Sequence, residues 1–273
     1  MDTNPIDASR QYAGGKMLAS RQDGVGLITF NQPEKRNAMS VEMWTGLGEI
    51  LDEFREDETV RVVVLTGAGD KAFVSGADIS QFEKQRSNAN AQKEYDRLTS
   101  AGRSKLGNFP KPTIAQIRGF CLGGGLAIAM QTDLRIAAHG SQFGIPAARL
   151  SIAYGFDGLR KLVLLVGPAH ARYILYTARR IDAAQAERIG LINQAVPDGE
   201  LEATVSAMAR EIADNAPLSI AASKLTIEQL TKDPAERDLA AVQLATERAF
   251  DSADYREGRA AFMEKRRPRF TGR

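Results

Sequence analysis

A buried strand, a glycine turn and a short apolar helix follow one another directly in this chain, and that order constrains its fold more than any other feature. The strand is "PTIAQIRG", the helix begins in "GFCLGGGLAIAM" with three consecutive glycines, and another strand, "DLRIAA", comes next. The strand "VRVVVLTG" also ends in a glycine turn. Continuous apolar strands that alternate with helices are typical of parallel sheets covered by helices. The sequence therefore predicts an α/β fold.

The segments before this unit have clear local signals. "KMLAS" and "VGLITF", within residues 16–30, have the apolar content of two strands, and Asp23-Gly24 between them favours a hairpin turn. Ser40 is a suitable N-cap for the helix that follows. The buried stripe of that helix is expected to consist of Trp44, Leu47, Leu51 and Phe54.

The later part of the chain becomes mostly helical. Asp182 is the expected N-cap of "DAAQAERIG", Gly190 its expected stop, and "LINQAV" a last strand. We expect three parts: a loose leader over 1–15, a core over 16–200 and a helical region over 201–273.

Composition excludes several classes of protein. Of 273 residues, 43% are hydrophobic and 26% charged, and no apolar run approaches the length of a membrane span. The 36 basic and 34 acidic residues give a net charge of +2, so no nucleic-acid partner is expected. The start of the chain has no apolar signal region, which predicts a cytoplasmic location. One cysteine, Cys121, and two histidines supply neither a disulfide framework nor a zinc site.

The three glycines admit two interpretations. A helix N-terminus has N–H groups without intrahelical partners and carries partial positive charge, so it suits an anion or a developing oxyanion. The glycines instead permit close packing of helix on sheet under the second interpretation. A phosphate loop is excluded because Leu126 and Ala127 follow the glycines where Lys and Ser or Thr are required. The Ser75-Gly76 turn in "KAFVSGADI" offers a second N–H, and two donors make an oxyanion hole.

Five segments together resemble the crotonase superfamily, also called the enoyl-CoA hydratase/isomerase family. They are "KAFVSGADI", "GFCLGGGLAIAM", "SQFGIPAARL", "RRIDAAQAERIGLINQAV" and "AFMEKRRPRF", and the resemblance runs from about residue 16 to the end. It implies a crotonase-like spiral of ββα repeats with a C-terminal helical region that builds homotrimers or dimers of trimers. The implied ligand is an acyl-CoA thioester, with coenzyme A arriving as part of the substrate and no separate cofactor, membrane or metal.

The resemblance also implies a set of site residues. The thioester carbonyl would lie between the N–H groups of Ser75 and Gly124, and the CoA nucleotide near "PEKRNAM", close to Lys35. Residues from a neighbouring subunit's C-terminal helix would complete that pocket. The full expected binding set is Lys35, Arg36, Ala38, Ala77, Asp78, Ile79, Gly123, Ala147, Arg149, Phe262 and Lys265.

The chain departs from the hydratases of this family at both acids. They use two glutamates, one on the glycine-headed helix and one about twenty residues later. The matching positions are Ala127 and Ala147, neither of which transfers a proton. The chemistry expected is therefore isomerase- or decarboxylase-like at least as much as hydration. The alternative is a protein of this fold that binds acyl-CoA without catalysis.

Three residues are candidates to replace the missing acids or to assist the site, each with a structural alternative. Asp157 is either a relocated acid or the N-cap of a helix that begins at Gly158. Tyr154 either donates a proton or fills an apolar wall. Arg149 either supplies positive charge or lies on the surface, and it cannot act as a base.

Three acids complete the list of side chains considered. Asp78 and Asp133 are expected mainly to act as caps or to stabilise turns. Glu83 is a more remote candidate for an acid.

Overall fold

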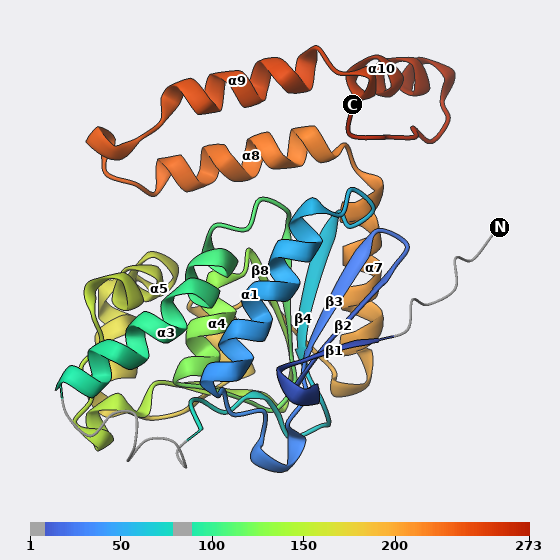
Figure 1. Cartoon of the computed structure of the whole chain (residues 1–273). Helices are drawn as coiled ribbons and strands as arrows, with labels where there is room; N and C mark the ends of the chain where they lie inside the picture. The colour runs from blue at the N-terminus through green and yellow to red at the C-terminus, as the bar shows by residue number, and fades with distance from the viewer. Residues whose placement is uncertain (1–8, 79–88) are drawn as a thin grey trace.

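Two sheets and a set of covering helices make up the computed structural model, which describes residues 9–78 and 89–273 (Figure 1). In the described residues the larger sheet has seven strands in the order β1-β2-β3-β4-β6-β8-β11, and the run from β3 to β11 is parallel. These strands are β1 Arg10–Tyr12, β2 Met17–Gln22, β3 Val25–Phe30, β4 Val62–Gly67, β6 Thr113–Ile117, β8 Leu134–Ala138 and β11 Gln194–Val196.

The smaller sheet carries the segments that the sequence marks as functional. Its order in the described chain is β10-β9-β7-β5, with β5, β7 and β9 parallel. The bounds are β5 Ala72–Val74, β7 Phe120–Leu122, β9 Gln142–Gly144 and β10 Ile181–Asp182.

A repeated unit connects the two sheets. A strand of the larger sheet is followed by a strand of the smaller sheet and then by a helix, as in β4-β5-α3, β6-β7-α4 and β8-β9-α5. The predicted α/β spiral of ββα repeats is therefore confirmed. The helices are α1 Val41–Glu56, α3 Ala89–Gly107, α4 Gly124–Gln131, α5 Phe156–Thr177, α6 Ala183–Arg188, α7 Leu201–Asp214, α8 Pro217–Leu230, α9 Leu239–Phe250 and α10 Ala253–Glu264.

Local signals placed several elements correctly. Strands β2 and β3 form the predicted hairpin around Asp23 and Gly24, both of which have positive φ. The Ser40 hydroxyl accepts a hydrogen bond from the Met43 N–H, and the stripe predicted for α1 is buried. The Asp182 carboxylate caps α6 by accepting from the Gln185 N–H at 2.7 Å.

The segments just outside both expected boundaries of the core, before residue 16 and after residue 200, pack on the larger sheet. Residues 10–12 form β1 against β2, so part of the expected loose leader is ordered. Helix α7 packs its apolar face, Leu201, Val205, Ala209 and Ala213, against the larger sheet. The part of the chain that stands apart from the sheets is therefore α8–α10, which form a separate layer above them (Figure 1).

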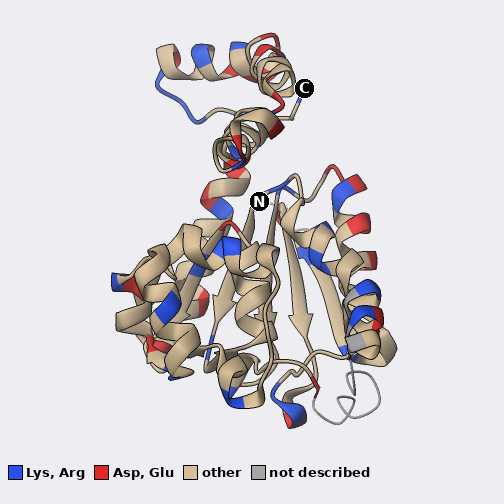
Figure 2. Ribbon diagram, turned by 90° about the vertical axis from the view of Figure 1, so that its left-hand side faces the viewer, with Lys and Arg blue, Asp and Glu red and all other residues tan. Residues whose placement is uncertain are grey.

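Charge is spread over the whole molecule. Figure 2 shows Lys and Arg interspersed with Asp and Glu over both the core and the C-terminal layer. No helix among the described residues is long and apolar enough to cross a membrane. In the same part of the chain, no group of three or more His, Cys, Asp or Glu side chains is placed to hold a metal ion.

Candidate active site

The glycine-headed helix α4 packs directly on β5. A Cβ atom added to Gly125 would lie 1.9 Å from the carbonyl oxygen of Val74, so only glycine permits this approach. Gly125 is buried, whereas Gly123, Gly124 and Ala127 are partly exposed on the other face of the helix start. The packing interpretation is therefore confirmed for Gly125, and the oxyanion interpretation stays a prediction for Gly123 and Gly124, which leave the N-terminus accessible.

The segment of Gly76 and Ala77 lies directly beside this N-terminus. A Cβ atom built on Gly124 would lie 3.7 Å from the Ala77 nitrogen and 3.6 Å from the Gly76 carbonyl carbon, so the two segments are adjacent. The N–H of Gly124 is in the first turn of α4, where no intrahelical acceptor exists. Among the described residues, the N–H of Ala77 donates no hydrogen bond.

The prediction that the Ser75 N–H is one of the two oxyanion donors is wrong. Its N–H donates to the carbonyl of Arg36 at 3.1 Å, and the Asp78 N–H donates to the carbonyl of Met39 at 2.9 Å. The segment runs as a short parallel bridge to residues 36–39, and alternate N–H groups along a bridged segment point to opposite sides. The N–H of Ala77, a residue predicted only to line the site, therefore points away from residues 36–39.

The segment 33–39 is fixed beside this bridge by Asn37. Its buried side-chain amide donates to the carbonyls of Ala68 and Ala72 at 3.0 and 2.8 Å, and its oxygen accepts from the Gln32 N–H. No local sequence pattern identifies Asn37 as a fixed point of the site, although its positive φ of 55° is the kind of position that asparagine tolerates. Ala38 is buried next to it.

Lys35 and Asp78 form an ion pair that joins the two segments. The Lys35 ammonium donates to the Asp78 carboxylate at 2.8 Å, and this hydrogen bond raises the pKa of Lys35. Asp78 is only 8% exposed, and its carboxylate is the partner of the Lys35 ammonium. Arg36 is exposed with its guanidinium 5.2 Å from the centre of the Phe120 ring.

The two positions where hydratases of the family carry glutamate differ in their surroundings. Ala127 is partly exposed on the accessible face of α4. Ala147 is 7% exposed and belongs to the main apolar cluster of the core. The space at the second position is therefore closed by packing, whereas the first remains beside the N-terminus of α4.

Tyr154 is the sequence candidate that the structure brings to the site. A Cβ atom added to Gly123 would lie 4.0 Å from the Tyr154 hydroxyl oxygen, and the ring packs on the edge of the core. Arg149 is exposed and forms no ion pair or hydrogen bond with any described residue. It therefore lies on the surface, as its structural alternative predicted.

The remaining candidates are placed less closely. The N-cap interpretation of Asp157 is wrong, because α5 begins at Phe156 and Gly155 is its N-cap. The Asp157 side chain lies outside the described part, as do Ile79 and Glu83. Asp133 joins the start of β8 to β6 by accepting from the Thr113 N–H and hydroxyl, a contact between strands and not the cap or turn that was predicted.

Cys121 is the one cysteine of the chain and does not serve as a nucleophile. Cys121 is fully buried in β7, and burial raises the pKa of its thiol, which excludes it as a thiolate nucleophile at neutral pH.

Phe262 lies on α10 and Lys265 is the C-cap of that helix. Helix α10 belongs to the C-terminal layer, far in space from the segment 33–39 that contains Lys35 (Figure 1).

In the described part of the chain, the N–H groups of Ala77 and Gly124 belong to adjacent segments, and two main-chain donors side by side are the arrangement from which oxyanion holes are built. The sequence model of the enoyl-CoA hydratase/isomerase family matches residues 20–273. The chain is 35% identical to the short-chain-enoyl-CoA hydratase of Clostridium acetobutylicum, over 92% of this chain and 95% of that protein. It is 34% identical to the crotonyl-CoA hydratase of Syntrophomonas wolfei, over 93% and 97% of the two chains.

A solved structure agrees with these relatives. The enoyl-CoA hydratase/carnithine racemase from Magnetospirillum magneticum superimposes with a TM-score of 0.91 at 37% identity, covering 94% of this chain and 96% of that one. The chain belongs to the enoyl-CoA hydratase/isomerase family, a family of enzymes that act on acyl-CoA thioesters, and it has the crotonase fold.

Proposed function

We propose that the protein binds an acyl-CoA thioester and stabilises the enolate of its acyl group. The observation that carries the proposal is the juxtaposition of the N–H groups of Ala77 and Gly124 in the described part of the chain. When a proton leaves the α-carbon of a saturated thioester, or the γ-carbon of a 2-enoyl thioester such as crotonyl-CoA, negative charge develops on the carbonyl oxygen. Two donors at about 2.7–3.1 Å stabilise that charge, and one such donor contributes about 2.7–4 kcal/mol to lowering the barrier.

The reaction we propose is isomerisation or decarboxylation of the acyl group at least as readily as hydration. Decarboxylation needs mainly an enolate sink, and isomerisation needs one group that moves a proton, whereas hydration also needs an activated water. Ala127 and Ala147 supply no acid or base for that water. Tyr154 is the first candidate to move a proton because its hydroxyl lies near Gly123, and Asp157 is the second.

A second candidate function is binding without catalysis. It is favoured by the same two alanines, since Ala147 is packed into the core and leaves no space for a carboxylate. Such a protein would bind the thioester tightly and leave it unchanged.

The CoA nucleotide is proposed to lie along 33–39 of one subunit, against Phe262 and Lys265 of another. Phe262 is 83% exposed, and a large apolar side chain this exposed on a lone chain is typical of an interface. Other large apolar side chains exposed on or beside the C-terminal helices are Ile227, Leu230, Leu239, Leu244, Phe250 and Met263. A homotrimer or a dimer of trimers would cover them, and sedimentation at several protein concentrations tests this. The cytoplasmic location stays a prediction.

The proposed function is tested by incubating the protein with crotonyl-CoA in deuterium oxide. Mass spectrometry follows hydration and deuterium uptake separately, and Tyr154→Phe and Asp157→Asn are measured in parallel. Deuterium uptake without hydration supports enolate chemistry of the isomerase kind. Uptake that is lost in one variant identifies the group that moves the proton.

The other outcomes separate the alternatives. Hydration that is lost in Asp157→Asn identifies a hydratase with a relocated acid. Binding of crotonyl-CoA without uptake or hydration leaves the non-catalytic candidate and decarboxylation, and release of carbon dioxide from a malonyl-type thioester distinguishes the two. If the protein binds no acyl-CoA, both candidates are wrong.

A further inference from the structure

A buried arginine lies at the C-terminal end of the helix whose N-terminus forms the site. Arg135 is on β8 and is 4% exposed, yet it forms no ion pair with a carboxylate in the described part of the chain. Burying a cation without an anionic partner is costly unless other groups compensate its charge. Besides the charge of Asp133 nearby, hydrogen bonds to neutral groups therefore have to compensate the burial of Arg135.

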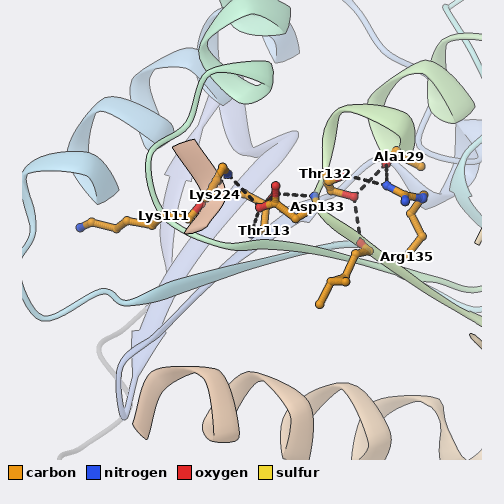
Figure 3. A network of polar contacts seen from close by, with 8 residues as sticks. Lys111, Thr113, Ala129, Thr132, Asp133, Arg135 and Lys224 are labelled. Atoms are coloured by element: carbon orange, nitrogen blue, oxygen red, sulfur yellow. Dashed lines mark hydrogen bonds and ion pairs between the residues drawn. The ribbon is translucent and has the colours of Figure 1, made fainter. Parts of the chain in front are cut away.

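Main-chain carbonyls of α4 and its C-cap provide much of that compensation. The Nη1 atom of Arg135 donates to the carbonyl of Thr132 at 2.6 Å and, at 3.5 Å, to the carbonyl of Ala129 (Figure 3). Its Nε donates to the carbonyl of Leu191 at 2.9 Å. The last carbonyls of a helix have no intrahelical donor and form the negative end of its dipole. Arg135 thus binds the negative end of α4.

The carboxylate of Asp133, two residues before Arg135 in the chain, accepts hydrogen bonds from other donors. Asp133 accepts from Thr113 and from the ammonium of Lys224 on α8, at 2.8 Å for the ion pair. Figure 3 shows this second set of contacts beside those of Arg135. Lys224 also donates to the carbonyl of Lys111, so its described contacts do not include α4. Of Arg135 and Lys224, it is Arg135 whose described hydrogen bonds reach the C-terminal end of α4.

We propose that Arg135 is a positioning residue for the oxyanion hole: by holding the C-terminal end of α4, it fixes the Gly124 N–H and supports the positive potential at that N-terminus. This inference rests on the function proposed above. Burial removes the Arg135 guanidinium from water and lowers its pKa, but the group remains a cation at neutral pH.

The size of the effect follows from the length of the helix. Eight residues at about 1.5 Å each place the charge about 12 Å from the Gly124 end. At an effective dielectric constant of about 20, a unit charge at about this distance alters an equilibrium that creates a second unit charge by about tenfold. Ground-state binding, which creates no charge, should change much less.

The test measures polarisation of a bound carbonyl directly. Butyryl-CoA labelled with heavy carbon at the thioester carbonyl is bound to each protein, and isotope-edited infrared spectroscopy gives the carbonyl stretching frequency. Stronger hydrogen bonding in the oxyanion hole lowers that frequency. The variants are Arg135→Gln, which keeps donors without charge, Arg135→Lys, which keeps the charge, and Lys224→Met as a matched control that removes the other cation.

We expect Arg135→Gln to lose part of the downshift and to slow deuterium exchange from crotonyl-CoA by up to about tenfold, with little change in Kd for butyryl-CoA. Arg135→Lys and Lys224→Met should retain the downshift. Since Arg135→Gln risks misfolding, Arg135→Lys alone also tests the proposal: a downshift that disappears although the charge is kept contradicts it.

The outcomes distinguish this inference from the proposed function. If the wild-type protein itself shows no downshift, the oxyanion hole is wrong. If the wild type shows one and folded Arg135→Gln shows the same, or if Lys224→Met loses as much as Arg135→Gln, the role of Arg135 is only structural.

Discussion

Replacing Gly124 with alanine tests the proposed oxyanion hole at a position where the added methyl group does not disturb the fold. The added methyl group would meet the Gly76 carbonyl carbon at 3.6 Å and the Ala77 nitrogen at 3.7 Å, which are ordinary van der Waals contacts. Gly124 is helical, and alanine is favoured over glycine within a helix by up to about 1 kcal/mol. The variant should therefore be as stable as the wild type, or slightly more stable.

The same methyl group lies where the carbonyl oxygen has to approach. An oxygen within hydrogen-bond distance of both N–H groups would compete with it for space, so the contribution of at least one donor is lost. That loss corresponds to about 2.7–4 kcal/mol, or roughly a hundredfold to a thousandfold in the rate of enolate formation. Stability and function are expected to change independently in this variant.

Gly125→Ala is the matched control with the opposite outcome. Its methyl group would lie 1.9 Å from the carbonyl oxygen and 2.7 Å from the carbonyl carbon of Val74, so β5 or α4 has to move. Overpacking of this kind costs about 1–3 kcal/mol and sometimes more, and here the obstacle is backbone.

Urea unfolding measures the stability of both variants, and deuterium exchange from crotonyl-CoA measures enolate formation. The expected pattern is a stable but inactive Gly124→Ala and a destabilised Gly125→Ala. Undiminished exchange in Gly124→Ala, at wild-type stability, would refute the assignment of this N-terminus as the oxyanion site.

Four further outcomes follow from the structure. Ala127→Glu should fold normally because the side chain is partly exposed, whereas Ala147→Glu should lower the midpoint of urea unfolding because it buries a carboxylate in the core. Cys121 should remain unmodified by a thiol reagent until the protein unfolds, and rapid labelling of the native protein would contradict its burial. Tyr154→Phe should slow deuterium exchange without weakening butyryl-CoA binding, as calorimetry can establish. The hydrogen bond from Arg266 lowers the pKa of Glu257 to about 2. The ionised Glu257 therefore stabilises the fold fully above its ordinary pKa, and this contribution is lost as the pH falls towards about 2. In Glu257→Gln this part of the pH dependence should be absent from acid unfolding curves.

The elements predicted correctly depend on residues close together in the chain. The β2–β3 hairpin needs only its turn residues, and the caps at Ser40 and Asp182 need only an acceptor three residues before an N–H. The periodic apolar residues of α1 identify its buried face in the same way. Short-range chemistry of this kind is present in the sequence itself.

The errors concern contacts between distant segments. Whether Ser75 or Ala77 has the outward N–H depends on the register of that segment against residues 36–39, which no local pattern specifies. The start of α5 depends on the path of the chain through Gly155. The role of Arg135 depends on carbonyls that include Leu191, which is 56 positions away in the chain.

A crystal structure of the protein with bound butyryl-CoA tests the central claim most directly. We expect the thioester oxygen to lie about 2.7–3.1 Å from the nitrogen atoms of both Ala77 and Gly124, with the Ser75 N–H still bonded to Arg36. An oxygen beyond hydrogen-bond distance of either nitrogen, or one bound by Ser75 instead, would contradict the account.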